Sequence, residues 1–120
     1  MPIRSLDSAV LKWPARDAVL SAARQWARAL CDRDETVEQV FCVGSYARGN
    51  WGVGSDLDVI VVIRDTELSA LERRIRYEPV DVPVPCDTWV YTGREWDALA
   101  SHSPNLWRRL QAEKLDLLGE

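Results

Sequence analysis

The chain has 120 residues, of which 47% are hydrophobic and 28% charged, which is the composition of an ordinary globular protein. Its formal net charge of −4 argues against a general affinity for nucleic acid backbones, which favour basic surfaces. The longest strongly apolar run is too short to span a bilayer, and no signal-peptide pattern opens the chain. We therefore expect one cytoplasmic domain over residues 1–120, with no membrane partner and no nucleic acid partner.

The chain begins with a predicted helix and a predicted strand. Apolar side chains recur at helical spacing over residues 14–31, and Pro14 suits the first turn of that helix. Residues 37–43 are rich in β-favouring side chains and end at Gly44. This first part therefore predicts a helix followed by a strand that stops at a glycine.

The strongest strand signal lies at residues 57–63, after a glycine-containing loop over 49–55. The continuous valine and isoleucine content of this strand favours a central position, covered on both faces. Asp65 or Thr66 can cap a following helix that runs to about Tyr77. Its expected apolar face is Leu68, Leu71 and Ile75. Its charged residues are expected to face solvent: Glu72, Arg73, Arg74 and Arg76.

Three prolines make residues 79–85 an irregular approach to a strand at 86–91. Thr92 and Glu95 predict a capping box that opens the next helix. A last helix is expected after Ser103-Pro104, ending near Gly119, with an apolar stripe of Leu106, Leu110 and Leu117. This order of elements predicts an α/β (α+β) fold with a small mixed β-sheet flanked by helices.

The stretch from Gly44 to Asp58 contains most of the candidate functional residues. Gly44 and Ser45 lie where a strand gives way to a helical turn, and backbone N–H groups with the serine hydroxyl suit phosphate oxygens there. Asp56 and Asp58 are two residues apart on a strand, so both carboxylates project from one face. Asp87 reaches the same place if the later strand is a neighbour.

Three clustered carboxylates repel one another. At ~4 Å and an effective dielectric near 20, each like-charge pair costs on the order of 4 kcal/mol. Hard oxygen ligands suit Mg²⁺ or Mn²⁺, and such a cation bridges to substrate phosphates. The pattern therefore predicts a site for two divalent metal ions at Asp56, Asp58 and Asp87, which receives a nucleoside triphosphate.

These residues carry a resemblance to a known family. Gly44-Ser45, ten intervening residues and then Asp56-Leu57-Asp58 resemble the signature of the minimal nucleotidyltransferases within the DNA polymerase beta superfamily. The segments "GSYARG", "SDLDVIVV" and "CDTWVYTGREW" are similar to the same family, over about residues 37–99. The resemblance implies a polymerase beta-like palm fold.

The resemblance also implies a role for each matching residue. Gly44 and Ser45 would hold the triphosphate, with Arg48 assisting against its charge. Asp56 and Asp58 would bind the two metal ions. Asp87 would be the third metal ligand and would help to activate the attacking hydroxyl.

Family members of this size commonly act as antitoxins that pair with HEPN-type toxins. The resemblance implies Mg²⁺-dependent transfer of AMP from ATP to a hydroxyl, often a tyrosine of such a toxin. Because the chain has no room for the acceptor domain of larger relatives, a partner protein or a homo-oligomer would complete the acceptor site. Two alternatives stay open: an antitoxin that neutralises its toxin by contact alone, and a transferase acting on a small molecule or an RNA end.

Several residues have a second interpretation. Asp81 is the reserve for Asp87, because the prolines before Asp87 leave its position open. Arg48 can equally be a solvated surface residue, and Trp51 either stacks on a base, covers the edge of the core or contacts a partner. Five tryptophans mostly fall on apolar stripes and are expected in the core: Trp13, Trp26, Trp89, Trp96 and Trp107. Cys31, Cys42 and Cys86 have no metal-binding spacing and are expected as buried, reduced thiols.

Overall fold

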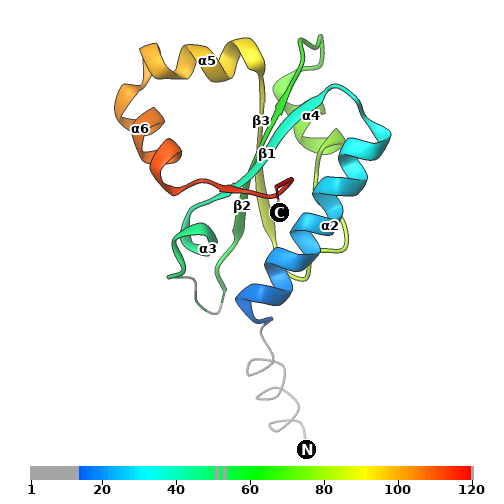
Figure 1. Ribbon diagram of the computed structural model, residues 1–120. Helices are drawn as coiled ribbons and strands as arrows, with labels where there is room; N and C mark the ends of the chain where they lie inside the picture. The colour runs from blue at the N-terminus through cyan, green and yellow to red at the C-terminus, as the bar shows by residue number, and fades with distance from the viewer. Residues whose placement is uncertain (1–13, 51, 53, 120) are drawn as a thin grey trace, which may run out of the picture.

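The computed structural model describes residues 14–50, 52 and 54–119, in which helices and strands are interleaved (Figure 1). The elements, in chain order, are α2 (Arg16–Arg33), β1 (Val37–Val43), α3 (Ser45–Arg48), β2 (Leu57–Ile63), α4 (Ala70–Arg76), β3 (Cys86–Thr92), α5 (Gly93–His102), α6 (Pro104–Glu113) and β4 (Leu115–Asp116). The expected mixed α/β fold is confirmed. Pro14 lies outside the first described helix, because Ala15 is its N-cap.

The four strands form one mixed sheet in the order β3-β2-β1-β4. Strand β1 pairs antiparallel with both β2 and β4, whereas β2 and β3 are parallel. The expected central position of β2 is therefore correct. Its parallel pairing with β3 brings the start of β3 beside the start of β2.

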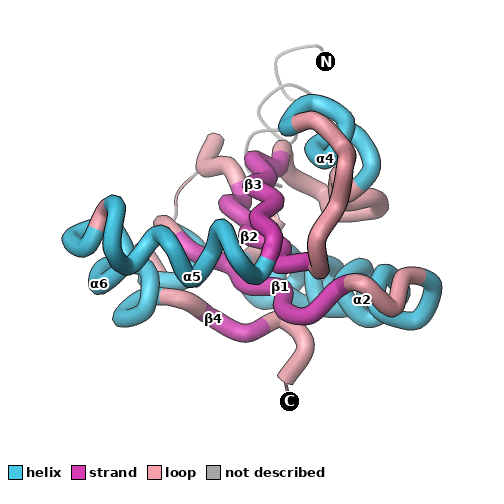
Figure 2. The backbone as a smooth tube through the Cα atoms, turned by 90° about the horizontal axis from the view of Figure 1, so that it is seen from above, coloured by secondary structure: helices cyan, strands magenta, loops and turns pink. Residues whose placement is uncertain are grey.

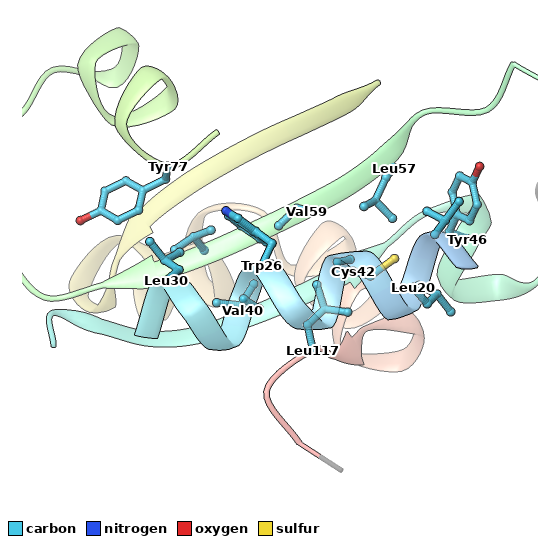
Figure 3. Packing of buried hydrophobic residues seen from close by; sticks show 14 of the residues in the cluster. Leu20, Trp26, Leu30, Val40, Cys42, Tyr46, Leu57, Val59, Tyr77 and Leu117 are labelled. Carbon is cyan, nitrogen blue, oxygen red and sulfur yellow. The ribbon is translucent and has the colours of Figure 1, made fainter. Parts of the chain in front are cut away.

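Helices cover both faces of this sheet (Figures 1 and 2). On one face, Trp26 and Leu30 of α2 pack among buried strand residues such as Val40 and Val59 (Figure 3). On the other face, α5 and α6 cover a second cluster of buried side chains: Phe41, Val43, Ile60, Val62, Trp96 and Leu110. Each large apolar side chain buried in this way stabilises the fold by roughly 1.5–3 kcal/mol.

Helix α4 is shorter than expected and turns a different face inward. Ser69, not Asp65 or Thr66, caps it, through a capping box with Glu72. Leu71 and Ile75 are 68% and 70% exposed, so the prediction of a buried apolar face was wrong. The apolar spacing was helical, but no element of the described chain covers that side of α4.

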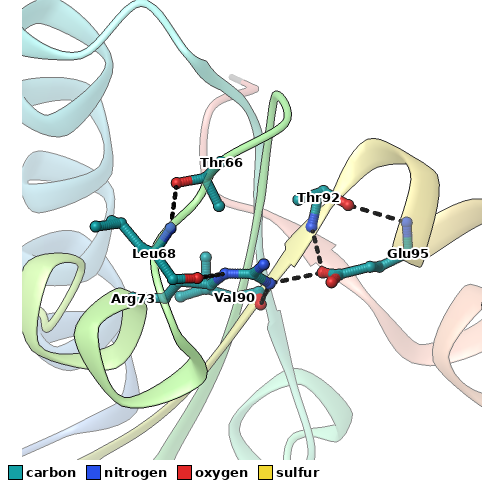
Figure 4. A network of polar contacts seen from close by, with 6 residues as sticks. All are labelled: Thr66, Leu68, Arg73, Val90, Thr92 and Glu95. Atoms are coloured by element: carbon teal, nitrogen blue, oxygen red, sulfur yellow. Dashed lines mark hydrogen bonds and ion pairs between the residues drawn. The ribbon is translucent and has the colours of Figure 1, made fainter.

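Arg73 is the inward-facing residue of α4, which corrects the expectation of a wholly solvated charged run. Its guanidinium donates to the carbonyl oxygens of Leu68 and Val90, and to the Glu95 carboxylate at 2.7 Å (Figure 4). Glu95 also closes the predicted capping box with Thr92, which is confirmed. One carboxylate therefore caps α5 and ties α4 to the sheet.

The C-terminal segment differs from the prediction of one long helix. Helix α6 ends at Glu113, and Lys114 turns the backbone into the extended conformation. The short strand β4 then pairs with β1, and Leu117 is buried on the α2 side of the sheet. Leu117 was expected to lie in the same stripe as Leu110, but the two residues belong to opposite cores.

The remaining side-chain expectations have mixed outcomes. Cys42 is buried, Cys31 and Cys86 are half-buried, and all three are free thiols. Trp89 is 42% exposed, so its assignment to the core was wrong. Trp13 and Trp51 lie outside the described residues. In the part of the chain that the structure describes, no helix is both long enough and apolar enough to cross a membrane.

Candidate active site

Gly44 allows a carboxylate to lie directly against the backbone at the end of β1. Its φ of 76° belongs to the left-handed region that glycine adopts readily. A Cβ atom at this position would overlap Oδ2 of Asp58. The Gly44-Ser45 turn and Asp58 are therefore in contact, although thirteen positions separate Ser45 and Asp58 in the sequence.

Asp87 lies directly opposite Asp58, because the two are register partners in the parallel pair β2–β3. Residues paired in this way place their side chains on the same face of a sheet. Asp56 precedes β2 and is exposed. Asp81 lies elsewhere, in the loop before β3 with a φ of 60°, where it lines a different pocket together with residues of α2. The structure therefore brings Asp87, and not the reserve candidate Asp81, to the acidic pair.

The charge of Asp58 is poorly compensated by the protein. Burial raises the pKa of its carboxyl above the ordinary value, and the charges of Asp87 and Asp56 raise it further. Arg48 lowers the pKa, but Glu113 opposes it. The Asp58 carboxylate has no hydrogen bond or ion pair within the described residues, so a positive charge from outside the chain would stabilise it.

Arg74 on α4 forms an ion pair with Asp87, with 2.7 Å between Nη2 and Oδ1. Across residues 14–50, 52 and 54–119, no three His, Cys, Asp or Glu side chains are gathered closely enough to enclose a metal ion. The donor chemistry nevertheless fits a hard divalent cation, since Asp58 is flanked by two other carboxylates that raise its pKa. Asp56, Asp58 and Asp87 are thus residues that could hold one.

A cavity of about 470 Å³ is lined by Asp58 among these three carboxylates. This volume lies within the roughly 300–1,000 Å³ typical of small-molecule sites. Its polar side is formed by Gly44, Ser45, Arg48 and Asp58, while its apolar wall includes Ile60, Trp89, Tyr91 and Leu106. The cavity can therefore receive a molecule with a charged portion and a planar or apolar portion.

Glu113 is a site residue that sequence reasoning missed. Its Oε2 accepts a 2.7 Å hydrogen bond from the Gly44 N–H, and its Oε1 lies 3.2 Å from Nη1 of Arg48. No local pattern marked Glu113, because the sequence predicted that the last helix continued past it. Arg74 was missed for a related reason: it belongs to a charged run that was assigned to solvent.

The thiols near the site are unsuited to nucleophilic chemistry. Burial, followed by the charge of Asp58, raises the pKa of Cys42 to about 12. Burial also raises the pKa of Cys86 to about 11. Because a thiolate is the reactive form, both sulfurs are inert near neutral pH. The carboxylates are therefore the candidate reactive groups of this site.

The family model described as "Nucleotidyltransferase domain" matches residues 23–107. The chain belongs to this family. The matched segment of this nucleotidyltransferase domain contains Gly44, Asp58 and Asp87, whereas Glu113 lies beyond it. No curated protein sequence matches the chain.

Solved structures show the same fold. A candidate nucleotidyltransferase from Sulfolobus solfataricus is 21% identical with a TM-score of 0.59, over 84% of this chain and 80% of that one. A chain from a toxin–antitoxin structure with AMP-PNP is also 21% identical, with a TM-score of 0.57 over 82% and 73%. A chain of a mutant MntA-HpeT toxin–antitoxin is 19% identical, with a TM-score of 0.52 over 78% and 70%. At these identities the likeness extends to the fold of the nucleotidyltransferase domain.

Proposed function

We propose that this nucleotidyltransferase domain transfers AMP from ATP to a hydroxyl of a partner protein, a tyrosine of a HEPN-type toxin. The observation that carries the proposal is the meeting of the Gly44-Ser45 turn with Asp58 at the end of the sheet, directly opposite Asp87. Family membership supports the nucleotidyl transfer. The toxin–antitoxin structures, one of them with AMP-PNP, support the partner and the nucleotide.

Each site residue has a role in this proposal. The Ser45 hydroxyl and Arg48 bind the terminal phosphates beside Gly44. Asp56, Asp58 and Asp87 would hold Mg²⁺ or Mn²⁺, most simply as two ions, which offset the charge of the triphosphate and polarise the α-phosphate. The raised pKa of Asp58 supports this assignment, since the Asp58 carboxylate forms no ion pair among the described residues, whereas Asp87 is paired with Arg74.

The topology favours one side for the acceptor. Displacement at the α-phosphorus occurs in line, so the acceptor approaches opposite the departing pyrophosphate. Gly44 follows β1, and β3 borders β2 on the side away from β1. If the terminal phosphates bind beside Gly44, pyrophosphate departs on the β1 side of the site. The acceptor hydroxyl then approaches from the β3 side, where Asp87 and the exposed Trp89 lie.

The proposed reaction exchanges one phosphorus–oxygen bond for another. The acceptor oxygen forms a bond to the α-phosphorus, and the bond from that phosphorus to the bridging oxygen breaks. Pyrophosphate leaves with the bonding electron pair. Asp87 takes the hydroxyl proton on Oδ2, because Oδ1 is engaged by Arg74.

Labelled ATP tests the reaction class directly. The purified protein is incubated with Mg²⁺, a HEPN-type toxin as the candidate partner, and ATP labelled at either the α- or the γ-phosphate. We expect the α label to enter the partner, together with a mass increase of one AMP group. Transfer of the γ label would indicate a kinase, and transfer of neither label would contradict the proposal.

The Arg74–Asp87 ion pair favours a second candidate, an antitoxin of the same fold that acts by contact alone. In that case the pair would be a permanent structural link and Asp87 would need no metal. Neutralisation of the toxin by an Asp58→Ala variant as complete as that by the wild type would support this candidate. Loss of neutralisation by a folded Asp58→Ala variant would support the enzyme.

A further inference from the structure

The carboxylate of Glu113 uses donors that the proposed function assigns to the triphosphate. Oε2 accepts from the Gly44 N–H at 2.7 Å, and Oε1 pairs with Arg48 at 3.2 Å. The Glu113 side chain is only 11% exposed, and it lines the same cavity as Ser45 and Asp58. An anionic oxygen from the chain itself therefore lies where a phosphate oxygen would bind.

A phosphate and Glu113 cannot share these donors. The Gly44 amide has one hydrogen, which the short bond to Glu113 already engages. Carboxylate and phosphate oxygens also have the same preference for backbone N–H groups and arginine, and they repel each other. Binding of the triphosphate to Gly44 and Arg48 therefore requires the Glu113 carboxylate to leave.

We propose that Glu113 is an internal competitor of the triphosphate, and that its displacement from Gly44 and Arg48 is part of nucleotide binding. This inference rests on the proposed function, because it takes the Gly44-Ser45 turn and Arg48 as the phosphate site. Glu113 is the last residue of α6 and precedes the extended Lys114. The competitor is thus attached at a helix end, where the backbone already changes direction.

Arg109 offers the displaced carboxylate a new partner. It lies one helical turn before Glu113 on α6 and lines the same cavity. Side chains four residues apart on a helix are neighbours. Arg109 has no carboxylate partner among the described residues, so Glu113 can exchange Arg48 for Arg109 while Arg48 turns to the phosphates.

Calorimetric titration of the full-length chain tests the competition. The probes are Mg²⁺-ATP, Mg²⁺-tripolyphosphate and adenosine, and the proteins are the wild type, Glu113→Gln and Glu113→Ala. We expect both variants to bind ATP and tripolyphosphate about tenfold more tightly than the wild type, the usual size of such a coupling. Affinity for adenosine should not change, because adenosine does not use the phosphate donors.

Asp65→Asn is the matched control, because it also removes one negative charge from an ion pair, the exposed Asp65–Arg94 pair outside this cavity. It should leave all three affinities at wild-type values. An equal gain in this control would show that net charge, and not displacement of Glu113, governs binding, and would overturn the inference. Thermal melting verifies that each variant is folded, and Glu113→Gln keeps the size of the side chain if Glu113→Ala does not fold.

The possible failures are distinguishable. Unchanged or weaker binding of tripolyphosphate by Glu113→Gln would overturn the competitor role, since Glu113 would then be a structural link or a ligand of the substrate. If the wild type still transfers the α label, the proposed function survives that result. Absence of ATP binding and of label transfer in every variant would overturn both.

Discussion

Asp34 and Asp58 are partly buried carboxylates near opposite ends of β1, and the chain surrounds them in opposite ways. Asp34 accepts hydrogen bonds from the backbone N–H of Thr36 at 3.0 Å, from the Thr36 hydroxyl at 2.6 Å and from the Tyr77 hydroxyl at 2.8 Å. Arg76 adds a positive charge at 3.7 Å. Asp58 instead faces Asp56, Asp87 and Glu113 as neighbouring charges, with Arg48 as the opposing one.

The pKa values of these two groups move in opposite directions for this reason. Burial alone would raise the pKa of Asp34, but the hydrogen bonds from Thr36 and Tyr77 and the charge of Arg76 together lower it. Burial and like charges raise the pKa of Asp58. A carboxylate that is hydrogen-bonded and ion-paired within the chain stabilises the fold. A carboxylate surrounded by like charges is instead suited to binding a cation that arrives with the substrate.

The largest expected difference between the two is in catalysis. Asp58→Asn should reduce α-label transfer by about a thousandfold or more, because it removes a proposed metal ligand. Asp34→Asn should retain transfer at temperatures where it is folded. Rates measured with equal amounts of folded protein test this. Comparable losses in both variants would mean that Asp58 has no special place in the reaction.

The second largest expected effect is a loss of stability on substitution of Asp34. Asp34→Asn should lower the free energy of unfolding by about 1–3 kcal/mol, since charged hydrogen bonds to Thr36 and Tyr77 are lost. Urea unfolding at neutral pH measures this. The exposed pair variant Asp65→Asn is the control and should change stability by no more than about 0.5 kcal/mol.

Lowering the pH should reduce the stability difference between the wild type and Asp34→Asn. The pKa of Asp34 is lower in the folded than in the unfolded state, so its contribution is complete above the unfolded value of about 4 and is lost as pH falls through the folded value. The stability difference between wild type and Asp34→Asn should therefore be constant near neutrality and shrink below about pH 4. A difference that persists at lower pH would assign the effect to packing.

Much of the fold was predictable because local signals and tertiary contacts agree. The valine-rich β2 has a composition that only a doubly covered strand explains, and the Thr92–Glu95 capping box is complete within four residues. The sequence placed both Asp56 and Asp58 on a strand, but β2 begins at Leu57, so only Asp58 of this pair lies on it. The pairing of Asp58 with Asp87 needed only the expectation that their strands were neighbours, which the parallel register confirms.

The errors arise where burial depends on distant segments. Leu71 and Ile75 have helical spacing, but the described chain supplies nothing that covers them, so α4 turns Arg73 inward. Leu117 is buried by a two-residue strand that pairs with β1, which helical periodicity cannot reveal. Glu113 reaches Gly44 across 69 positions in the sequence, and only the ending of α6 places it there.

The smallest expected effect is on the melting temperature of Asp58→Asn, which should not fall as it does in Asp34→Asn. In metal-free buffer near neutral pH, Asp58→Asn should keep or raise the melting temperature by a few degrees, because it removes repulsion with Asp56 and Asp87. Asp34→Asn should lower the melting temperature under the same conditions. Mg²⁺ with ATP should then stabilise the wild type but not Asp58→Asn, since binding to the folded state stabilises by mass action. A clear loss of stability in metal-free Asp58→Asn would show that both carboxylates serve the fold, and the contrast between them would no longer mark a site.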